Sequence, residues 1–160
     1  MMDTLIGRPY GSVMEQQHAR TAQTHPAPLE LAPTDVVEAI RKRSFATLAT
    51  TSAEGRPHAA GILYALSNDR LYVSTKASSR KARNILENPR VAITIAVRRA
   101  PVGPPSSIIF QADARVLDLD DPDLRQAAAS GDLKAVTSHG ELELPGGCFI
   151  EIALPRKVVT

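Results

Sequence analysis

The feature that most constrains the fold is a series of short apolar or β-branched segments, each of strand length and each followed by turn-forming residues. The turn Ser67-Asn68-Asp69-Arg70 joins two of them at hairpin distance, which favours antiparallel pairing. Val91–Val97 is almost continuously apolar, so we expect it to be buried on both faces. The spacing predicts a small, mainly β, antiparallel barrel rather than a βαβ sheet. The strands are predicted over Phe45–Thr50, Pro57–Leu66, Leu71–Thr75, Val91–Val97, Ser107–Leu119 and Gly147–Leu154.

A few short helices are expected among these strands. They run from Thr34 to the basic run Arg41–Arg43, over Ser79–Asn88, and from Asp121-Pro122 to Ala129 or Ser130. Thr and Asp are good N-cap residues, and proline suits the first helical position but stops a helix further along. We interpret the basic run as a solvated helix end that complements the helix dipole.

The ends and one internal segment differ from this pattern. Residues 1–33 are rich in Pro, Gly and Gln and show no helical or strand period, so we expect a flexible N-terminal arm. The ordered domain is then placed at residues 34–160. Arg98–Pro105 contains three prolines and a glycine and is predicted to be a loop.

Composition excludes several classes of protein. The chain has 160 residues, with 19 Lys and Arg against 17 Asp and Glu, and this formal net charge of +2 argues against wholesale nucleic-acid or membrane binding. Cys148 is the only cysteine, so an intrachain disulfide is impossible. The apolar runs are too short to span a bilayer, and the first residues do not resemble a signal peptide. We therefore expect a cytoplasmic protein.

Common catalytic and metal motifs are missing from the sequence. It contains neither the G-x-G-x-x-G nor the G-x-x-x-x-G-K-[ST] phosphate loop, and neither an H-E-x-x-H metal motif nor a G-x-S-x-G elbow. The four histidines have no ligand spacing, and the acids at 118–123 lack the glycine and distal glutamate of a calcium loop. The sequence therefore predicts no metal site.

The most informative segment is Ser74–Asn84, which joins a predicted strand to a predicted helix. The first helical turn carries free N–H groups and partial positive charge, so acidic residues belong there. This turn instead holds Arg80 and Lys81, with Lys76 just upstream, and hydroxyls from Ser74, Thr75, Ser78 and Ser79 surround them. A solvated basic helix end is the alternative. The density of hydroxyls and the stacking of like charge favour a phosphate-binding site.

The stretch Leu71–Ala92, with Ser79-Arg80-Lys81 followed by Asn88-Pro89-Arg90-Val91, resembles the pyridoxamine 5′-phosphate oxidase superfamily. That superfamily is the split β-barrel group of FMN and deazaflavin (coenzyme F-420) proteins. Ala46–Thr50 followed by Gly55–His58 matches the family's opening hairpin. The resemblance covers Phe45–Leu119 well and Gly147–Thr160 more loosely.

The resemblance implies a homodimer with two cofactor sites at the subunit interface. Ser79, Arg80 and Lys81 would bind the cofactor phosphate, and Ser74, Thr75 and Lys76 would lie along the ribityl or isoalloxazine edge. His58, Ala60 and Ile62 lie on the strand that usually lines the ring system, and Gln111 matches a glutamine that reaches the flavin from the partner subunit.

The sequence also departs from the family. The true oxidases carry an Arg and a Lys in an R-x-x-x-L-K pattern on the strand that here reads Ala59–Leu66, with neither residue. This argues against pyridoxal phosphate synthesis and favours the flavin and deazaflavin reductase branches. The expected function is hydride transfer between bound FMN, or alternatively the deazaflavin coenzyme, and a small unsaturated substrate, with the hydride chemistry supplied by the cofactor.

Two other functions remain open from the sequence. One is a non-catalytic carrier that sequesters the same cofactor. The other is a haem-binding split barrel, for which His58 and His139 are the candidate axial ligands. In the oxidoreductase, His58 could orient a substrate or donate a proton, and Lys76 could stabilise negative charge on the reduced ring or contact phosphate. An ordinary half-exposed histidine is an equal interpretation of His58.

Overall fold

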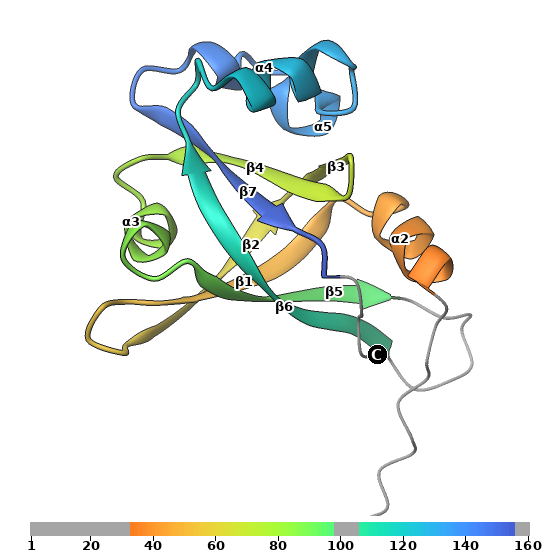
Figure 1. The fold of residues 1–160 in the computed structure, drawn as a ribbon, viewed down its shortest axis with the longest axis vertical. Helices are drawn as coiled ribbons and strands as arrows, with labels where there is room; N and C mark the ends of the chain where they lie inside the picture. Colours follow the sequence, from red (N-terminus) through yellow and green to blue (C-terminus); the bar gives the residue numbers. More distant parts are fainter. Residues whose placement is uncertain (1–32, 98–105, 156–160) are drawn as a thin grey trace, which may run out of the picture.

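The computed structural model describes residues 33–97 and 106–155 of the chain (Figure 1). Within these ranges, seven antiparallel strands form one curled sheet in the order β2-β1-β5-β6-β7-β4-β3, and four short α-helices lie around it. The strands are β1 Phe45–Thr51, β2 Pro57–Leu63, β3 Ala65–Ser67, β4 Arg70–Lys76, β5 Arg90–Val97, β6 Ser106–Leu117 and β7 Gly147–Ala153. The helices are α2 Pro33–Arg41, α3 Arg80–Glu87, α4 Pro122–Ala129 and α5 Lys134–Thr137, with a 3₁₀ turn at Glu141–Glu143. The predicted antiparallel half-barrel is therefore confirmed.

The long strand β6 closes the curl because it changes partner along its length. Residues 106–113 pair with β5, whereas Ala114–Leu117 pair with β7. The concave side encloses the main core, to which β1, β5 and β7 contribute Leu48, Ile93 and Ile150. A second, smaller core lies where α4 and α5 pack on β4 and β7, at the top of Figure 1.

Local signals placed most element boundaries correctly. Asn68 and Asp69 both adopt positive φ, 47° and 57°, as the tight hairpin turn between β3 and β4 requires. Asp121 is the N-cap residue of α4, as predicted, and Ser79, where a helix was predicted to begin, is the N-cap residue of α3. Helix α2 begins at Pro33, one residue before the predicted cap at Thr34 and at the last residue of the predicted arm.

The prediction of one strand over Pro57–Leu66 is wrong. Tyr64 separates β2 from β3 because its backbone N–H binds the carbonyl of Ser44 at 2.8 Å and its hydroxyl donates to the carbonyl of Ile40, also at 2.8 Å. The chain can therefore leave β1 and turn to pair with β4. Such long-range bonds leave no local trace in the sequence.

The prediction that Val91–Val97 is buried on both faces is also wrong within the described part of the chain. Val91, Ile93 and Ile95 are buried in the core, whereas Ala92 and Thr94 are half-buried and Ala96 is exposed. No described element packs as a layer on that outer face. Residues 1–32 of the predicted arm and the predicted loop Arg98–Pro105 lie outside the described residues.

Candidate functional site

The turn from β4 into α3 is held by hydroxyl groups. The side chain of Ser79 accepts a hydrogen bond from the backbone N–H of Ala82 at 3.3 Å, which caps the helix. Thr75 donates its hydroxyl hydrogen to the Ser79 oxygen at 3.2 Å, and the Ser79 N–H binds the carbonyl of Lys76. The start of α3 is therefore fixed against the end of β4.

The positive charge at this turn has no acidic partner among the described residues. The first turn of α3 holds no acidic residue, and Lys76, Arg80 and Lys81 take part in none of the ion pairs or side-chain hydrogen bonds there. Lys76 and Arg80 are exposed, and Lys81 is half-buried. Unpaired cations that lie beside the free N–H groups of a helix N-terminus can bind a phosphate group.

A cavity of about 290 Å³ opens beside this turn, where β2 approaches β4. Three of the predicted site residues line it, namely Ile62, Ser74 and Lys81. Its remaining lining residues come from the same two strands, from α5 and from the segment after α5: Gly61, Leu63, Val73, Ala135, Val136, His139 and Glu141. Apolar residues of β2, β4 and α5 form part of the wall, and Ser74, Lys81, His139 and Glu141 add polar or charged groups. Ligand sites commonly combine apolar walls with such polar groups.

The other predicted residues do not line this cavity. Thr75, Lys76, Ser79 and Arg80 lie at the same β4–α3 turn, next in sequence to its lining residues. His58 and Ala60 share the inner face of β2 with Ile62, because residues two apart in a strand point to the same side. The Nδ1 atom of His58 is buried and has no hydrogen-bond partner among the described residues.

Gln111 is separate from the cavity in this chain. It lies on β6 opposite Ala92 of β5, and its side chain is exposed on the outer face of the sheet. A role for Gln111 at a site on the same chain therefore finds no support in the geometry, whereas a role toward a partner subunit requires this outward direction.

His139, which the sequence offered only as a candidate axial ligand of haem, and Glu141, which was not predicted, both line the cavity. Gly140 adopts a φ of +80° between them, so the chain turns and the Glu141 carboxylate accepts the His139 backbone N–H at 2.8 Å. This hydrogen bond is the main reason that the pKa of Glu141 lies below its ordinary value. The His139 Nδ1 atom lies 3.6 Å from the same carboxylate. The buried pair Leu133 and Val136, at helical spacing, was the sequence signal for α5.

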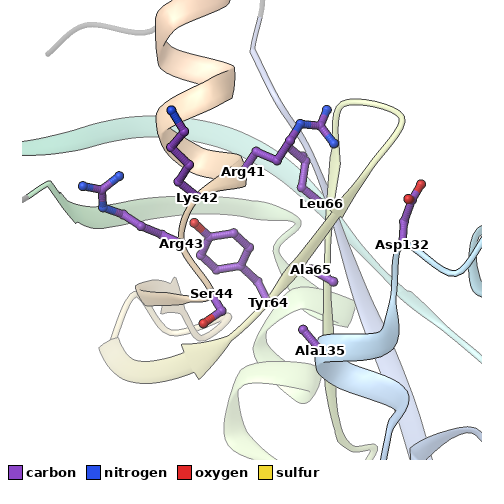
Figure 2. Close-up of a pocket in the computed structure, with 9 residues that line it drawn as sticks. All are labelled: Arg41, Lys42, Arg43, Ser44, Tyr64, Ala65, Leu66, Asp132 and Ala135. Atoms are coloured by element: carbon purple, nitrogen blue, oxygen red, sulfur yellow. The ribbon is translucent and has the colours of Figure 1, made fainter.

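A second cavity, of about 350 Å³, lies on the other side of α5 and shares Ala135 with the first. Figure 2 shows the basic run Arg41–Arg43 fanning out from the end of α2 around Tyr64. Ala65 and Leu66 of β3 and Asp132, which precedes α5, contribute further lining. This cavity was not predicted.

Three further side chains are packed in the interior. Cys148 is buried, and burial raises the pKa of its thiol, so it is a packing residue. Tyr64 and Tyr72 are also buried. No group of His, Cys, Asp or Glu among the described residues could hold a metal ion. None of the described helices is long and apolar enough to cross a membrane.

Comparisons with known proteins agree on one family. The family model of pyridoxamine 5′-phosphate oxidase matches residues 32–153. None of the curated proteins matches the chain. Among solved structures, the haem storage protein HutZ from Vibrio cholerae has a TM-score of 0.65 at 21% identity, over 78% of this chain and 91% of HutZ. An FAD-binding protein from Mesorhizobium loti has a TM-score of 0.63 at 18% identity, over 81% and 93%. A haem-binding protein from Mycobacterium smegmatis has a TM-score of 0.60 at 18% identity, over 78% and 52%.

Proposed function

Because the chain belongs to the pyridoxamine 5′-phosphate oxidase family, we propose that it binds a flavin-type cofactor at the β4–α3 turn and acts as an oxidoreductase. The cofactor is FMN or, alternatively, the deazaflavin coenzyme, and either would supply the hydride chemistry for a small unsaturated substrate. The observation that carries the proposal is the group of unpaired cations at the start of α3, beside a cavity that has both apolar and polar walls. The FAD-binding protein from Mesorhizobium loti shows that this fold can hold a flavin.

Each part of the site has a distinct task in this proposal. Arg80 and Lys81 neutralise the phosphate, while the first N–H groups of α3 donate hydrogen bonds to it. Ser74 donates its hydroxyl to the polar edge of the ring system or to the chain that links ring and phosphate. Ile62 and Val73 provide apolar walls that exclude water from one ring face. His139 and Glu141 lie at the cavity rim, where a substrate would enter.

We also propose that the functional unit is a homodimer formed through the outer face of β2, β1, β5 and β6. In the strand register, the charged residues Arg90 and Asp113 lie opposite each other at one margin of this face. The uncharged face is the remainder, formed by Ala59, Gly61, Leu63, Phe45, Thr47, Ala49, Ala92, Thr94, Ala96, Ser107, Ile109 and Gln111. Phe45, Leu63 and Ile109 are 60%, 59% and 50% exposed, which is typical of an interaction surface.

The size of the cavity supports the same dimer. The cavity of one chain, about 290 Å³, is at the lower end of the range of ligand pockets, about 300–1,000 Å³. Gly61 and Leu63 belong both to the cavity and to the uncharged face. A second copy packed there would enlarge the cavity wall and bring its Gln111 toward the ring, as the resemblance implies.

Titration of the purified protein with FMN and with the deazaflavin coenzyme tests the cofactor site. We expect one of them to bind, and Arg80→Ala/Lys81→Ala to weaken binding about tenfold or more, because charge-assisted bonds to phosphate are lost. Arg56→Ala/Arg125→Ala removes the same charge from exposed positions elsewhere and should leave the affinity unchanged. Equal weakening by both double variants, or no binding at all, would contradict the phosphate site.

Reoxidation of the bound, reduced cofactor by an added electron acceptor separates an enzyme from a carrier. An oxidoreductase should accelerate this reaction over the free cofactor, whereas a sequestering protein should slow it. The acceptor series would at the same time indicate the class of substrate.

Haem binding is the second candidate function, and one observation favours it. Of the two candidate axial ligands, His139 lines the cavity, whereas His58 does not. HutZ and the Mycobacterium smegmatis protein, which store and bind haem, share the fold. Haem titration followed by its absorption band tests this function. Binding that is lost in His139→Ala and retained in His58→Ala would establish it in place of the flavin.

A further inference from the structure

The second cavity is lined by more basic side chains than acidic ones, and not all of the basic side chains have a structural role. Its rim holds Arg41, Lys42 and Arg43 against one carboxylate, that of Asp132, which already accepts a hydrogen bond from the Ser67 hydroxyl at 3.0 Å. Arg41 forms no hydrogen bond or ion pair through its side chain with any described residue. Lys42 pairs with Glu38 at 3.3 Å, but both side chains are more than half exposed. Exposed pairs of this kind contribute little to stability.

These cations are not all needed to end helix α2. The carbonyl of Ala39 accepts from the Arg43 guanidinium at 2.8 Å, and the carbonyl of Ile40 accepts from both the Arg43 N–H and the Tyr64 hydroxyl. The last turn is therefore capped without the side chains of Arg41 and Lys42. A helix end that is already satisfied leaves those two charges available for another partner.

The frame that carries the charges is rigid. Tyr64 is 1% exposed, and burial raises its pKa to about 12, so its hydroxyl remains a donor to the α2 backbone. Its backbone N–H holds Ser44 at the other end of the same turn. The basic run Arg41–Arg43 thus borders the same cavity as Tyr64, Ala65 and Leu66 (Figure 2). The backbone there is fixed by these hydrogen bonds, and the long basic side chains extend from it.

We propose that this cavity is an anion-binding site that takes a carboxylate or phosphate group, held by Arg41 and Lys42 above the floor of Tyr64. Arginine binds both groups through two parallel N–H bonds, and lysine adds a mobile positive charge. The site is distinct from the phosphate site at α3, and Ala135 of α5 lies between the two cavities. The anion is either a free metabolite or an acidic extension of the ligand in the first cavity.

Calorimetric titration with citrate and with pyrophosphate tests the free-anion source. The titration uses Arg80→Ala/Lys81→Ala protein, so that the α3 site does not contribute. In this background, Arg41→Ala/Lys42→Ala should raise the Kd of at least one probe about tenfold or more. Arg43 is kept because it caps α2. Arg56→Ala/Arg125→Ala is the charge-matched control and should leave the Kd unchanged.

Titration of the wild-type chain with two cofactors tests the second source, and this arm alone rests on the proposed function. If an acidic extension reaches the cavity, Arg41→Ala/Lys42→Ala weakens the glutamyl-tailed deazaflavin coenzyme and leaves FMN, with its single phosphate, unaffected. Loss of affinity for either a probe or the tailed coenzyme supports the site. The proposal is overturned if neither affinity changes, or if the control variant weakens binding equally. Failure of both cofactors to bind in wild type would contradict the proposed function and leave the probe titrations valid.

Discussion

At the scale of single residues, Glu151 is the most constrained side chain outside the two cavities. It lies on β7, is 3% exposed, and is bound by Arg115 through two hydrogen bonds of 2.8 and 3.1 Å. Arg70 and the Tyr72 hydroxyl, from β4, complete its shell. A buried carboxylate with fewer partners would be strongly destabilising. This network therefore ties β4, β6 and β7 together beneath α4.

Glu151 should make stability depend on acidic pH. Burial alone would raise its pKa, but the bonds from Arg115, Arg70 and Tyr72 outweigh burial and hold the pKa below its ordinary value. Its contribution is therefore complete above the unfolded-state pKa of about 4.3 and is lost as the pH falls through the folded-state pKa. We expect Glu151→Gln to cost about 2 kcal/mol at pH 7, where charge-assisted hydrogen bonds are lost.

Urea unfolding at pH 7 and at pH 3 measures this dependence. The difference in unfolding free energy between wild type and Glu151→Gln should shrink at the lower pH. Glu143→Gln removes an exposed carboxylate and should change little at either pH. A difference that stays constant between the two pH values would show that the charge of Glu151 does not stabilise the fold.

At the scale of elements, helix α3 depends on Ser79 for its start, and the same hydroxyl is a candidate phosphate ligand. Removing the cap with Ser79→Ala should cost about 1 kcal/mol, whereas Ser79→Gly should cost only a few tenths. If Ser79 also binds the cofactor, both variants should lose affinity equally despite their different stabilities. Chemical unfolding together with cofactor titration checks this.

The N-cap of α4 is a matched control for that experiment. Asp121 caps α4 through bonds to the N–H groups of Asp123 and Leu124, at 2.9 and 3.2 Å. Asp121→Ala should lower stability by a similar amount and leave cofactor affinity unchanged. If affinity instead follows stability across all three variants, Ser79 acts only as a cap.

The elements also show how far local sequence determines the structure. Caps and prolines located α3 and α4, and alternation located the strands, because these signals depend on residues close in sequence. The break at Tyr64 depends on Ser44 and Ile40, some twenty residues earlier, and was missed for that reason.

Of the candidate site, the β4–α3 turn could be predicted from the sequence, whereas the wall that contains His139 and Glu141 could not. The cations of the β4–α3 turn were visible because they contradict the helix dipole within a single turn. His139 and Glu141 enter the cavity through α5 and the turn at Gly140, which bring residues sixty positions away against β4. The second cavity was missed because the basic run has an adequate local explanation as a helix end.

At the scale of the whole molecule, the curled sheet leaves one face uncovered by any described element. Apart from Arg90 and Asp113 at its margin, that face is uncharged over four strands, whereas the opposite end of the sheet is covered by α4 and α5 (Figure 1). In the proposed dimer, a second copy rather than a second layer of the same chain would cover the outer side of Val91–Val97. Its inner residues fill the core, and its outer residues would fill an interface.

Ile109→Lys tests this view, because it places a charge on the β6 side of the uncharged face, opposite Thr94 of β5. Wild type should sediment as a dimer, and the variant should sediment as a monomer with an unchanged circular dichroism spectrum. Burying an unpaired lysine opposes association but is tolerated in an exposed position. If the partner's Gln111 completes the site, the monomeric variant should also bind the cofactor more weakly than wild type. Leu144→Lys, at an exposed leucine outside this face, should remain dimeric and bind normally. A monomeric wild type, or a dimeric Ile109→Lys, would mean that this face has another role and that the cavity works within one chain.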